Sequence, residues 1–228
     1  MEDGNQMNSV IYEDNHIIVV YKKPNIPVCK DESKDMDLLN MIKTYLKIKY
    51  NKPGNVYLGM VHRLDRPVSG IMVFAKTSKA ASRLSEQVKN HTFKKTYNAV
   101  VIGKPNSKET FIDKLLKDSK TNIVKVNQNG KEAVLDYELI DTKDNLSLVS
   151  INLKTGRSHQ IRVQFSYHNY PLYGDNKYNK YAVTGEQIAL LSKKIEFIHP
   201  VTKENMSFEI DLPNKYPWNI FNINKFKN

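Results

Sequence analysis

The chain reads VHRLDRPVSGIMVFA at residues 61–75, where a charged segment runs directly into an apolar strand. Asp65 lies there between Arg63 and Arg66. Opposite charge within a few ångströms favours the ionised carboxylate. Such a carboxylate can act as a nucleophile or a base, and the arginines can bind phosphate groups. A structural salt bridge in a surface turn is the alternative interpretation of the same residues.

The composition indicates a polyanionic partner. Lys and Arg number 35 against 24 Asp and Glu in 228 residues, so the formal net charge is +11. A surplus of this size favours RNA or DNA, although solvated surface lysines would produce the same charge. Cys29 is the single cysteine, which excludes an intrachain disulfide and a cysteine metal cluster. No apolar run has the length of a membrane span, and the polar N-terminus does not resemble a signal peptide. We therefore expect a cytoplasmic protein that binds no membrane.

Hydrophobic patterning predicts more strands than helices, and several neighbouring strands are joined by short turns. We expect strands at residues 10–13, 16–21, 56–60, 71–75, 93–102, 133–140, 146–153, 188–191, 195–198 and 206–210. This pattern predicts an α+β fold, a mixed and largely antiparallel β-sheet with flanking helices. Nothing in the chain resembles a linker, so we expect one domain over 1–228, with a loose tail at 1–8.

Three helices are expected. Asp37 could cap the first, which ends near Lys49, and Ser78 could start the second. Ser158 could cap the third, which ends near His168. Residues 106–130 are polar and rich in lysine, and their structure is not predicted beyond an apolar cluster at 111–116.

A second motif, TGRSHQIR, occupies residues 155–162. Its glycine permits a tight turn and a helix start follows, which is a natural site for an anion. Arg157 and Arg162 add positive charge. The alternative is a capped helix with exposed arginines, in which His159 is a hydrogen-bonded scaffold residue. The spacing does not establish whether this motif and the Asp65 motif meet.

Five blocks in order resemble the RluA family of pseudouridine synthases. They lie at residues 11–24, 62–76, 95–97, 155–163 and 173–175. Val68 is a departure, because the family usually has threonine there. The resemblance implies the pseudouridine synthase catalytic fold, with an active-site cleft across the sheet and with no cofactor or metal. Fewer than ten residues precede the first expected strand, so we expect no separate N-terminal RNA-binding domain.

By this resemblance Asp65 is the catalytic carboxylate, Arg162 is its ion-pair partner and Tyr97 packs on the target base. Arg63 enters the RNA helix where the base was. The other implied RNA contacts are His62, Arg66, Lys76 and Arg157. The chemistry agrees with these roles, because a buried carboxylate needs a cationic partner and stacking on an aromatic ring is worth about 1–3 kcal/mol. A paired base must leave the helix before it can react.

The predicted function is isomerisation of uridine to pseudouridine in ribosomal or transfer RNA by a monomer. A catalytically silent RNA-binding or RNA-folding module of the same fold is the first alternative. A nucleoside glycosidase is the second, but that chemistry normally uses two carboxylates and the motifs offer only Asp65.

Overall fold

The computed structural model describes residues 9–31 and 33–222. The predicted loose tail at 1–8 lies outside the described residues. The chain divides into two compact units: unit 1 comprises Met1–Phe93 and Lys194–Glu209, and unit 2 comprises Lys94–Lys193 and Ile210–Asn228. The expectation of a single domain stays a prediction.

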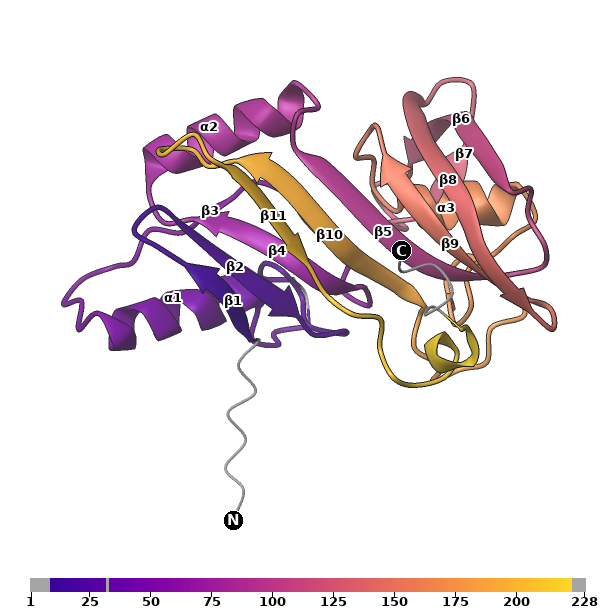
Figure 1. Ribbon diagram of the computed structural model, residues 1–228, viewed down its shortest axis with the longest axis horizontal. Helices are drawn as coiled ribbons and strands as arrows, with labels where there is room; N and C mark the ends of the chain where they lie inside the picture. The colour runs from indigo at the N-terminus through magenta and orange to yellow at the C-terminus, as the bar shows by residue number, and fades with distance from the viewer. Residues whose placement is uncertain (1–8, 32, 223–228) are drawn as a thin grey trace, which may run out of the picture. The chain divides into compact units, whose positions relative to one another are not determined.

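Antiparallel strands form the centre of unit 1 (Figure 1). Its strands are β1 (Val10–Glu13), β2 (Ile17–Lys22), β3 (Gly59–Met60), β4 (Ser69–Ala75) and β11 (Asn205–Glu209). β2 pairs with both β1 and β4, and Ile18 lies opposite Phe74. The side chains of β2 and β4 are buried on both faces, as expected for apolar runs with few polar positions.

Two helices flank the strands of unit 1. α1 (Leu38–Lys49) begins after Asp37, whose side chain accepts the backbone N–H of Asn40, so the predicted cap is confirmed. α2 spans Ser78–Lys89, but its cap is Thr77, which accepts from the backbone of Ala80. The predicted start of this helix at Ser78 is therefore confirmed, with Thr77 as the residue that caps it.

Unit 2 contains the run of strands β5-β9-β8-β6-β7, with each neighbouring pair antiparallel. They are β5 (Lys94–Ile102), β6 (Lys108–Lys117), β7 (Val124–Val126), β8 (Lys131–Lys143) and β9 (Leu146–Leu153). The predicted hairpin of β8 and β9 is confirmed, and its turn places Asp144 in the left-handed region. β6 and β7 lie where the sequence predicted little, because Ile112 and Leu116 are exposed on β6 and break the alternation of polar and apolar residues.

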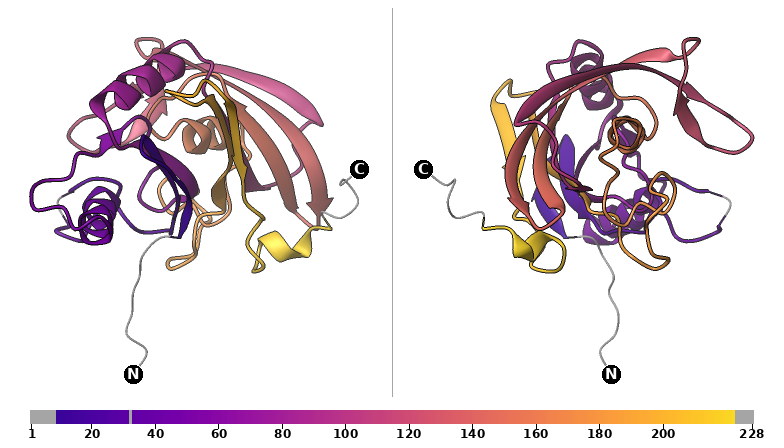
Figure 2. Two further views of the ribbon diagram at one scale, coloured as in Figure 1. Left: turned by 60° about the vertical axis from the view of Figure 1, so that its left-hand side comes forward. Right: turned by 90° about the vertical axis from the view of Figure 1, so that its right-hand side faces the viewer.

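Helix α3 (Gln160–Tyr167) packs against the strands of unit 2, and Figure 2 shows it end-on beneath the curved sheet. Leu115, Val124, Ala133 and Val163 form a buried cluster that joins the helix to the sheet. Ser158 does not cap this helix. The N-cap is His159, which is left-handed at φ 52° and makes no capping bond with its side chain.

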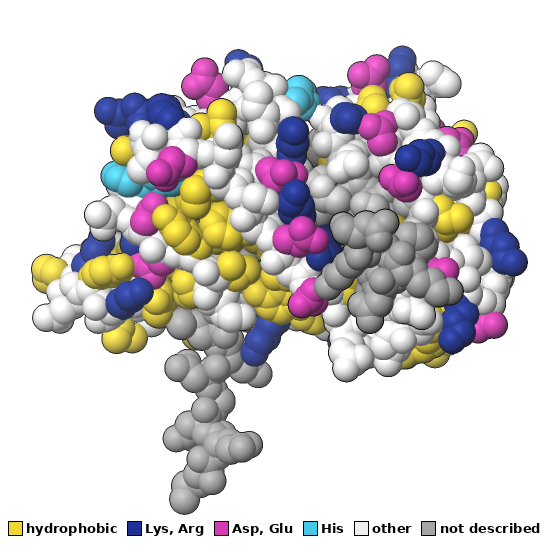
Figure 3. All heavy atoms as spheres, in the orientation of Figure 1, with side chains coloured by type: hydrophobic (Ala, Val, Ile, Leu, Met, Phe, Trp, Pro, Cys, Tyr) yellow, Lys and Arg dark blue, Asp and Glu magenta, His cyan; other side chains and the backbone are white. Residues whose placement is uncertain are grey.

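The predicted α+β class is confirmed, with one correction near the C-terminus. The two strands expected at 188–191 and 195–198 are one strand, β10 (Leu190–Ile198), which runs from unit 2 into unit 1. In unit 1 it pairs with β11. A short 3₁₀ helix, η1 (Trp218–Ile220), follows in unit 2. Basic and acidic side chains are interspersed on the face viewed in Figure 3.

Candidate active site

A tight turn presents Asp65 in unit 1. The backbone N–H of Val68 donates to the Asp65 carbonyl at 3.0 Å, so residues 65–68 close on themselves. Along the preceding segment the burial alternates: His62 and Leu64 are buried, whereas Arg63 is exposed. Arg63 has no hydrogen-bond or ion-pair partner among the residues described. The buried side chains of His62 and Leu64 therefore fix this segment to the protein, and the Arg63 side chain stays in solvent two residues before Asp65.

The anchoring role of His62 is visible in its contacts. Its Nε2 accepts the backbone N–H of Val73 in β4 at 3.1 Å, and its ring packs on Phe93 with centroids 5.4 Å apart. These contacts connect the Asp65 segment to the central strands of unit 1. Contact of His62 with RNA, as the resemblance implies, stays a prediction.

Lys22 is the unexpected neighbour of Asp65. Its side chain is fully buried, and Nζ donates to the Arg66 carbonyl at 2.9 Å and to the Lys23 carbonyl at 3.1 Å. Burial lowers the pKa of Lys22 to about 7, although the nearby Asp65 carboxylate opposes the shift. The Lys22 side chain thus holds the Asp65 turn by a hydrogen bond to the backbone of the turn, and it supplies a cation close to the Asp65 carboxylate.

Two of the predicted RNA contacts already have carboxylate partners in unit 1. Arg66 pairs with Asp31 at 3.2 Å and also with Asp35. The ammonium of Lys76 lies 2.7 Å from Glu13, and both side chains are nearly buried. Contact of either cation with RNA stays a prediction, and Lys76 would first have to leave a buried pair.

In unit 2, Arg162 forms a bidentate pair with Asp175. Its Nε lies 2.9 Å from Oδ2 and a terminal nitrogen lies 2.7 Å from Oδ1, with both side chains buried. The guanidinium also lies over the ring of Tyr178, 5.1 Å from the centroid. This geometry is the strong, orientation-fixing form of an arginine–carboxylate pair. Asp175 is a partner that the sequence analysis did not assign, although its block was noted.

The loop before α3 is held by Gln160 rather than by a serine cap. Its Oε1 accepts from the Thr155 hydroxyl at 2.8 Å and from the backbone N–H of Arg157 at 3.0 Å. Its Nε2 donates to the Val134 carbonyl in β8. Arg157 itself is exposed, and its Nε donates to the Glu132 carbonyl at 2.7 Å.

Tyr97 lies in β5 opposite Ile151 of β9, and its side chain is 5% exposed. The predicted site residues therefore form two sets. Asp65, His62, Arg63, Arg66 and Lys76 belong to unit 1, whereas Tyr97, Arg157 and Arg162 belong to unit 2. The pairing of Asp65 with Arg162 stays a prediction.

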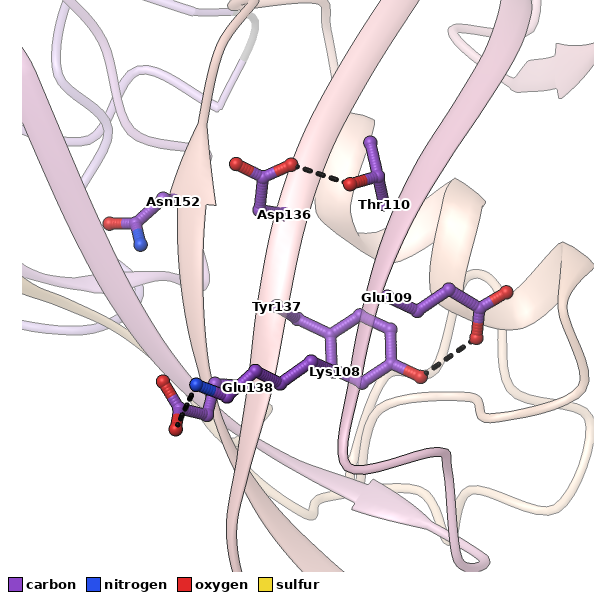
Figure 4. Close-up of a pocket in the computed structure, with 7 residues that line it drawn as sticks. All are labelled: Lys108, Glu109, Thr110, Asp136, Tyr137, Glu138 and Asn152. Carbon is purple, nitrogen blue, oxygen red and sulfur yellow. Dashed lines mark hydrogen bonds and ion pairs between the residues drawn. The ribbon is translucent and has the colours of Figure 1, made fainter.

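A surface hollow of about 350 Å³ lies elsewhere in unit 2, and Figure 4 shows its lining. Each carboxylate of its lining has a partner within the hollow. Glu138 pairs with Lys108 at 3.0 Å, Asp136 accepts from the Thr110 hydroxyl at 2.8 Å, and Glu109 accepts from the Tyr137 hydroxyl. None of its lining residues is a predicted site residue. With three carboxylates against one lysine, this hollow suits a polyanion poorly.

No helix within residues 9–31 and 33–222 has the length and apolar character needed to cross a membrane. The same ranges contain no group of three or more His, Cys, Asp or Glu side chains placed to hold a metal ion.

Comparison with known proteins identifies the family. The family model for RNA pseudouridylate synthase matches residues 16–167, a range that includes Asp65, Tyr97 and Arg162. The uncharacterized RNA pseudouridine synthase YjbO of Bacillus subtilis is 36% identical over 208 residues, covering 90% of this chain and 72% of that protein. Ribosomal large subunit pseudouridine synthase C of Vibrio vulnificus is 32% identical over 212 residues, covering 90% and 65%.

Two solved human structures share the fold. RNA pseudouridylate synthase domain containing 4 superposes with a TM-score of 0.75 at 19% identity, covering 90% of this chain and 88% of that one. RNA pseudouridylate synthase domain containing 1 gives 0.73 at 23% identity, covering 93% and 87%. The chain belongs to the RNA pseudouridylate synthase family, whose members are isomerases.

Proposed function

We propose that this chain isomerises specific uridines in structured RNA to pseudouridine, with Asp65 as the catalytic residue. The observation that carries the proposal is the family match over residues 16–167, which spans the Asp65 turn. Relatives named for the ribosomal large subunit make that RNA the first substrate to test, with transfer RNA the second. The proposed place of action is the cytoplasm, and the proposed active form is a monomer.

In the proposed reaction the target uridine leaves the RNA helix and Arg63 takes its place. The exposed guanidinium of Arg63, two residues before Asp65, supports this role. Extrusion costs stacking and pairing energy, and an arginine offsets part of that cost by stacking and by binding phosphate. No electron carrier takes part, because the product has the same atoms and oxidation level as the uridine.

The carboxylate of Asp65 either attacks ribose C1′ or removes a ribose proton, and either step breaks the bond from C1′ to N1. The base then turns and C1′ joins C5, either by displacement of the Asp65 oxygen from C1′ or by addition to the eliminated sugar, which takes its ribose proton back. The C5 proton leaves to solvent and N1 takes up a proton, so the product is an isomer of the uridine. The ring of Tyr97 stacks on the detached base and keeps it in the site. Arg162 is the proposed ion-pair partner of Asp65, because a carboxylate in a water-excluded site needs a cation beside it.

The test compares Asp65→Asn with Asp144→Asn, a matched change at an exposed turn residue whose left-handed backbone tolerates asparagine. Release of tritium from RNA labelled at uridine C5 should fall by at least about three orders of magnitude in Asp65→Asn only. RNA affinity should stay within about threefold of wild type in both variants, because neither change removes a cation.

Turnover by Asp65→Asn at the wild-type rate would sink the proposal. Wild-type protein that binds RNA without releasing tritium would favour the RNA-folding alternative. Free uracil in the products would favour the glycosidase.

A further inference from the structure

Lys95 is a cation that the mechanism above does not use. It lies in β5, its side chain is half-buried, and no described residue bonds to or forms an ion pair with its ammonium. Burial lowers the pKa of Lys95, and no neighbouring carboxylate counteracts this shift. An ammonium without a carboxylate or carbonyl partner in a partly desolvated position costs stability. Such a cation is understandable if a ligand supplies the missing anion.

The strand geometry places Lys95 beside the proposed base-stacking residue. Successive side chains of a strand alternate between its faces, so Lys95 and Tyr97 lie on the same face of β5, about 7 Å apart along the chain. Thr96 lies on the other face, where its hydroxyl bonds to Asn152 of β9 at 3.1 Å. A single nucleotide has the size to reach both Lys95 and Tyr97.

The loop that begins the second motif, at Thr155 and Gly156, lies beside the ammonium of Lys95. A Cβ atom built on Gly156 would lie 3.6 Å from Lys95 Nζ, so the ammonium lies alongside the backbone of this loop. Gly156 is exposed and has no side chain, which leaves the approach open from solvent. The carboxylate of Asp136 lies on the face of Thr96, because both residues are opposite Asn152 of β9, and it pairs with Lys154 at 2.9 Å. The exposed backbone of Gly156 therefore lies beside a positive charge that no described residue pairs with.

We propose that Lys95 binds a phosphate of the RNA backbone beside the exposed Gly156, next to the base held by Tyr97. Lysine binds phosphate as a point charge, and a glycine allows the RNA backbone to come close. The assignment rests on the proposed function, which supplies the RNA. Lys95 is then an RNA-positioning residue that sets the phosphate of the target nucleotide or of its neighbour.

The first experiment measures affinity for a short single-stranded oligouridylate in the wild type, Lys95→Gln, Lys95→Arg and Lys94→Gln. Lys94 is the matched control, because it is the neighbouring lysine and is exposed. Lys95→Gln should bind about tenfold more weakly at low salt, and its slope of log affinity against log salt should be smaller by about 0.7. Lys95→Arg and Lys94→Gln should keep slopes close to that of wild type. Equal slopes for Lys95→Gln and Lys94→Gln would overturn the proposal.

The second experiment identifies the group that Lys95 binds. It uses a hairpin RNA with a single uridine in its loop, in which one linkage at a time is a neutral methylphosphonate. One linkage next to the uridine should weaken wild-type binding about tenfold and have no further effect on Lys95→Gln. If every linkage weakens both proteins equally, Lys95 binds no phosphate. If only removal of the uracil base abolishes the difference between the two proteins, Lys95 binds the base and the proposal is wrong.

Thermal unfolding separates binding from a structural role. Because the ammonium has no partner to lose among the described residues, Lys95→Gln should melt at or above the wild-type temperature. A melting temperature well below wild type would assign a structural role to Lys95 and overturn the proposal. Failure of the proposed function would look different: the wild type would form no pseudouridine, whereas the salt slopes would still report on Lys95.

Discussion

At the scale of single residues, the surroundings of Asp65 depend on a lysine that lies 43 positions earlier in the chain. Lys22 is the last residue of β2, and its ammonium donates to the carbonyl of Arg66 inside the Asp65 turn. The same ammonium is buried without a described carboxylate in direct contact, so its charge is costly below its pKa of about 7. One residue therefore couples the geometry of the turn to pH.

Replacement of Lys22 tests this coupling through the pH dependence of stability. The pKa of Lys22 is about 7 in the folded protein and about 10.5 in the unfolded chain. Between these values the unfolded state binds more protons, so wild-type stability should rise with pH relative to Lys22→Met. The free energy of unfolding of the wild type minus that of Lys22→Met should increase by about 2 kcal/mol from about pH 7 to about pH 9. Urea unfolding at several pH values measures it.

The control for that experiment is Lys23→Met, because Lys23 is exposed and adjacent. Its stability difference from wild type should not change over the same pH range. A flat difference for Lys22→Met would show that Lys22 does not titrate near neutral pH.

At the scale of elements, the segment after α3 holds Asp175 in place for Arg162. Gly174 makes the segment possible: its φ is +68°, and a Cβ atom there would lie 2.4 Å from the Gln187 carbonyl oxygen. Asp175 then accepts the backbone N–H of Lys177 at 3.0 Å with Oδ1, one of the two oxygens that pair with Arg162. The buried ion pair thus depends on a backbone position that only glycine can occupy.

Gly174→Ala should lower the free energy of unfolding by about 3–5 kcal/mol, because a left-handed conformation and an overlap with backbone act together. Gly185→Ala is the matched control, since its φ is +96° but nothing lies within 4 Å of the added carbon. It should cost only about 1–2 kcal/mol. Chemical denaturation measures both values. Equal losses would mean that strain alone acts and that the close approach at Gly174 relaxes cheaply.

At the scale of the whole molecule, the net charge of +11 acts on any polyanion before a specific contact forms. Several cations are already paired within the protein, among them Lys49, Lys76, Arg66 and Lys154. Such pairs weaken the positive electrostatic potential close to these cations but leave the net charge of +11 unchanged. Affinity for RNA should therefore depend strongly on salt even where few cations touch phosphate.

RNA affinity should fall roughly 10- to 100-fold between about 50 and about 200 mM salt, because each phosphate contact releases condensed counterions. Titrations of a labelled hairpin RNA with the protein, followed by fluorescence anisotropy at several salt concentrations, measure the slope of log affinity against log salt. Asp144→Asn, which removes one exposed negative charge, should leave the slope close to that of wild type. Affinity that does not change with salt would show that the charge surplus takes no part in binding.

Much of the fold was predictable, because local patterns decide it. The cap of α1 at Asp37, the hairpin of β8 and β9, and the buried runs of β2 and β4 all follow from turn residues, caps and hydrophobic periodicity. β6 and β7 were missed because the exposed Ile112 and Leu116 obscure the alternation in β6, and because β7 has only three residues. The start of α3 was misplaced because Gln160 holds the loop from inside the helix.

The sequence by itself determined the charge, the strand-rich class and the identity of the motif residues, since these depend only on which residues stand near one another in the chain. Tertiary structure decided which charges have partners: Lys22 beside the Asp65 turn, Asp175 on Arg162, Glu13 on Lys76, and no described partner for Lys95. The physical reason is that Coulomb energy and desolvation depend on distance and burial in space, and neither can be read from separation along the chain.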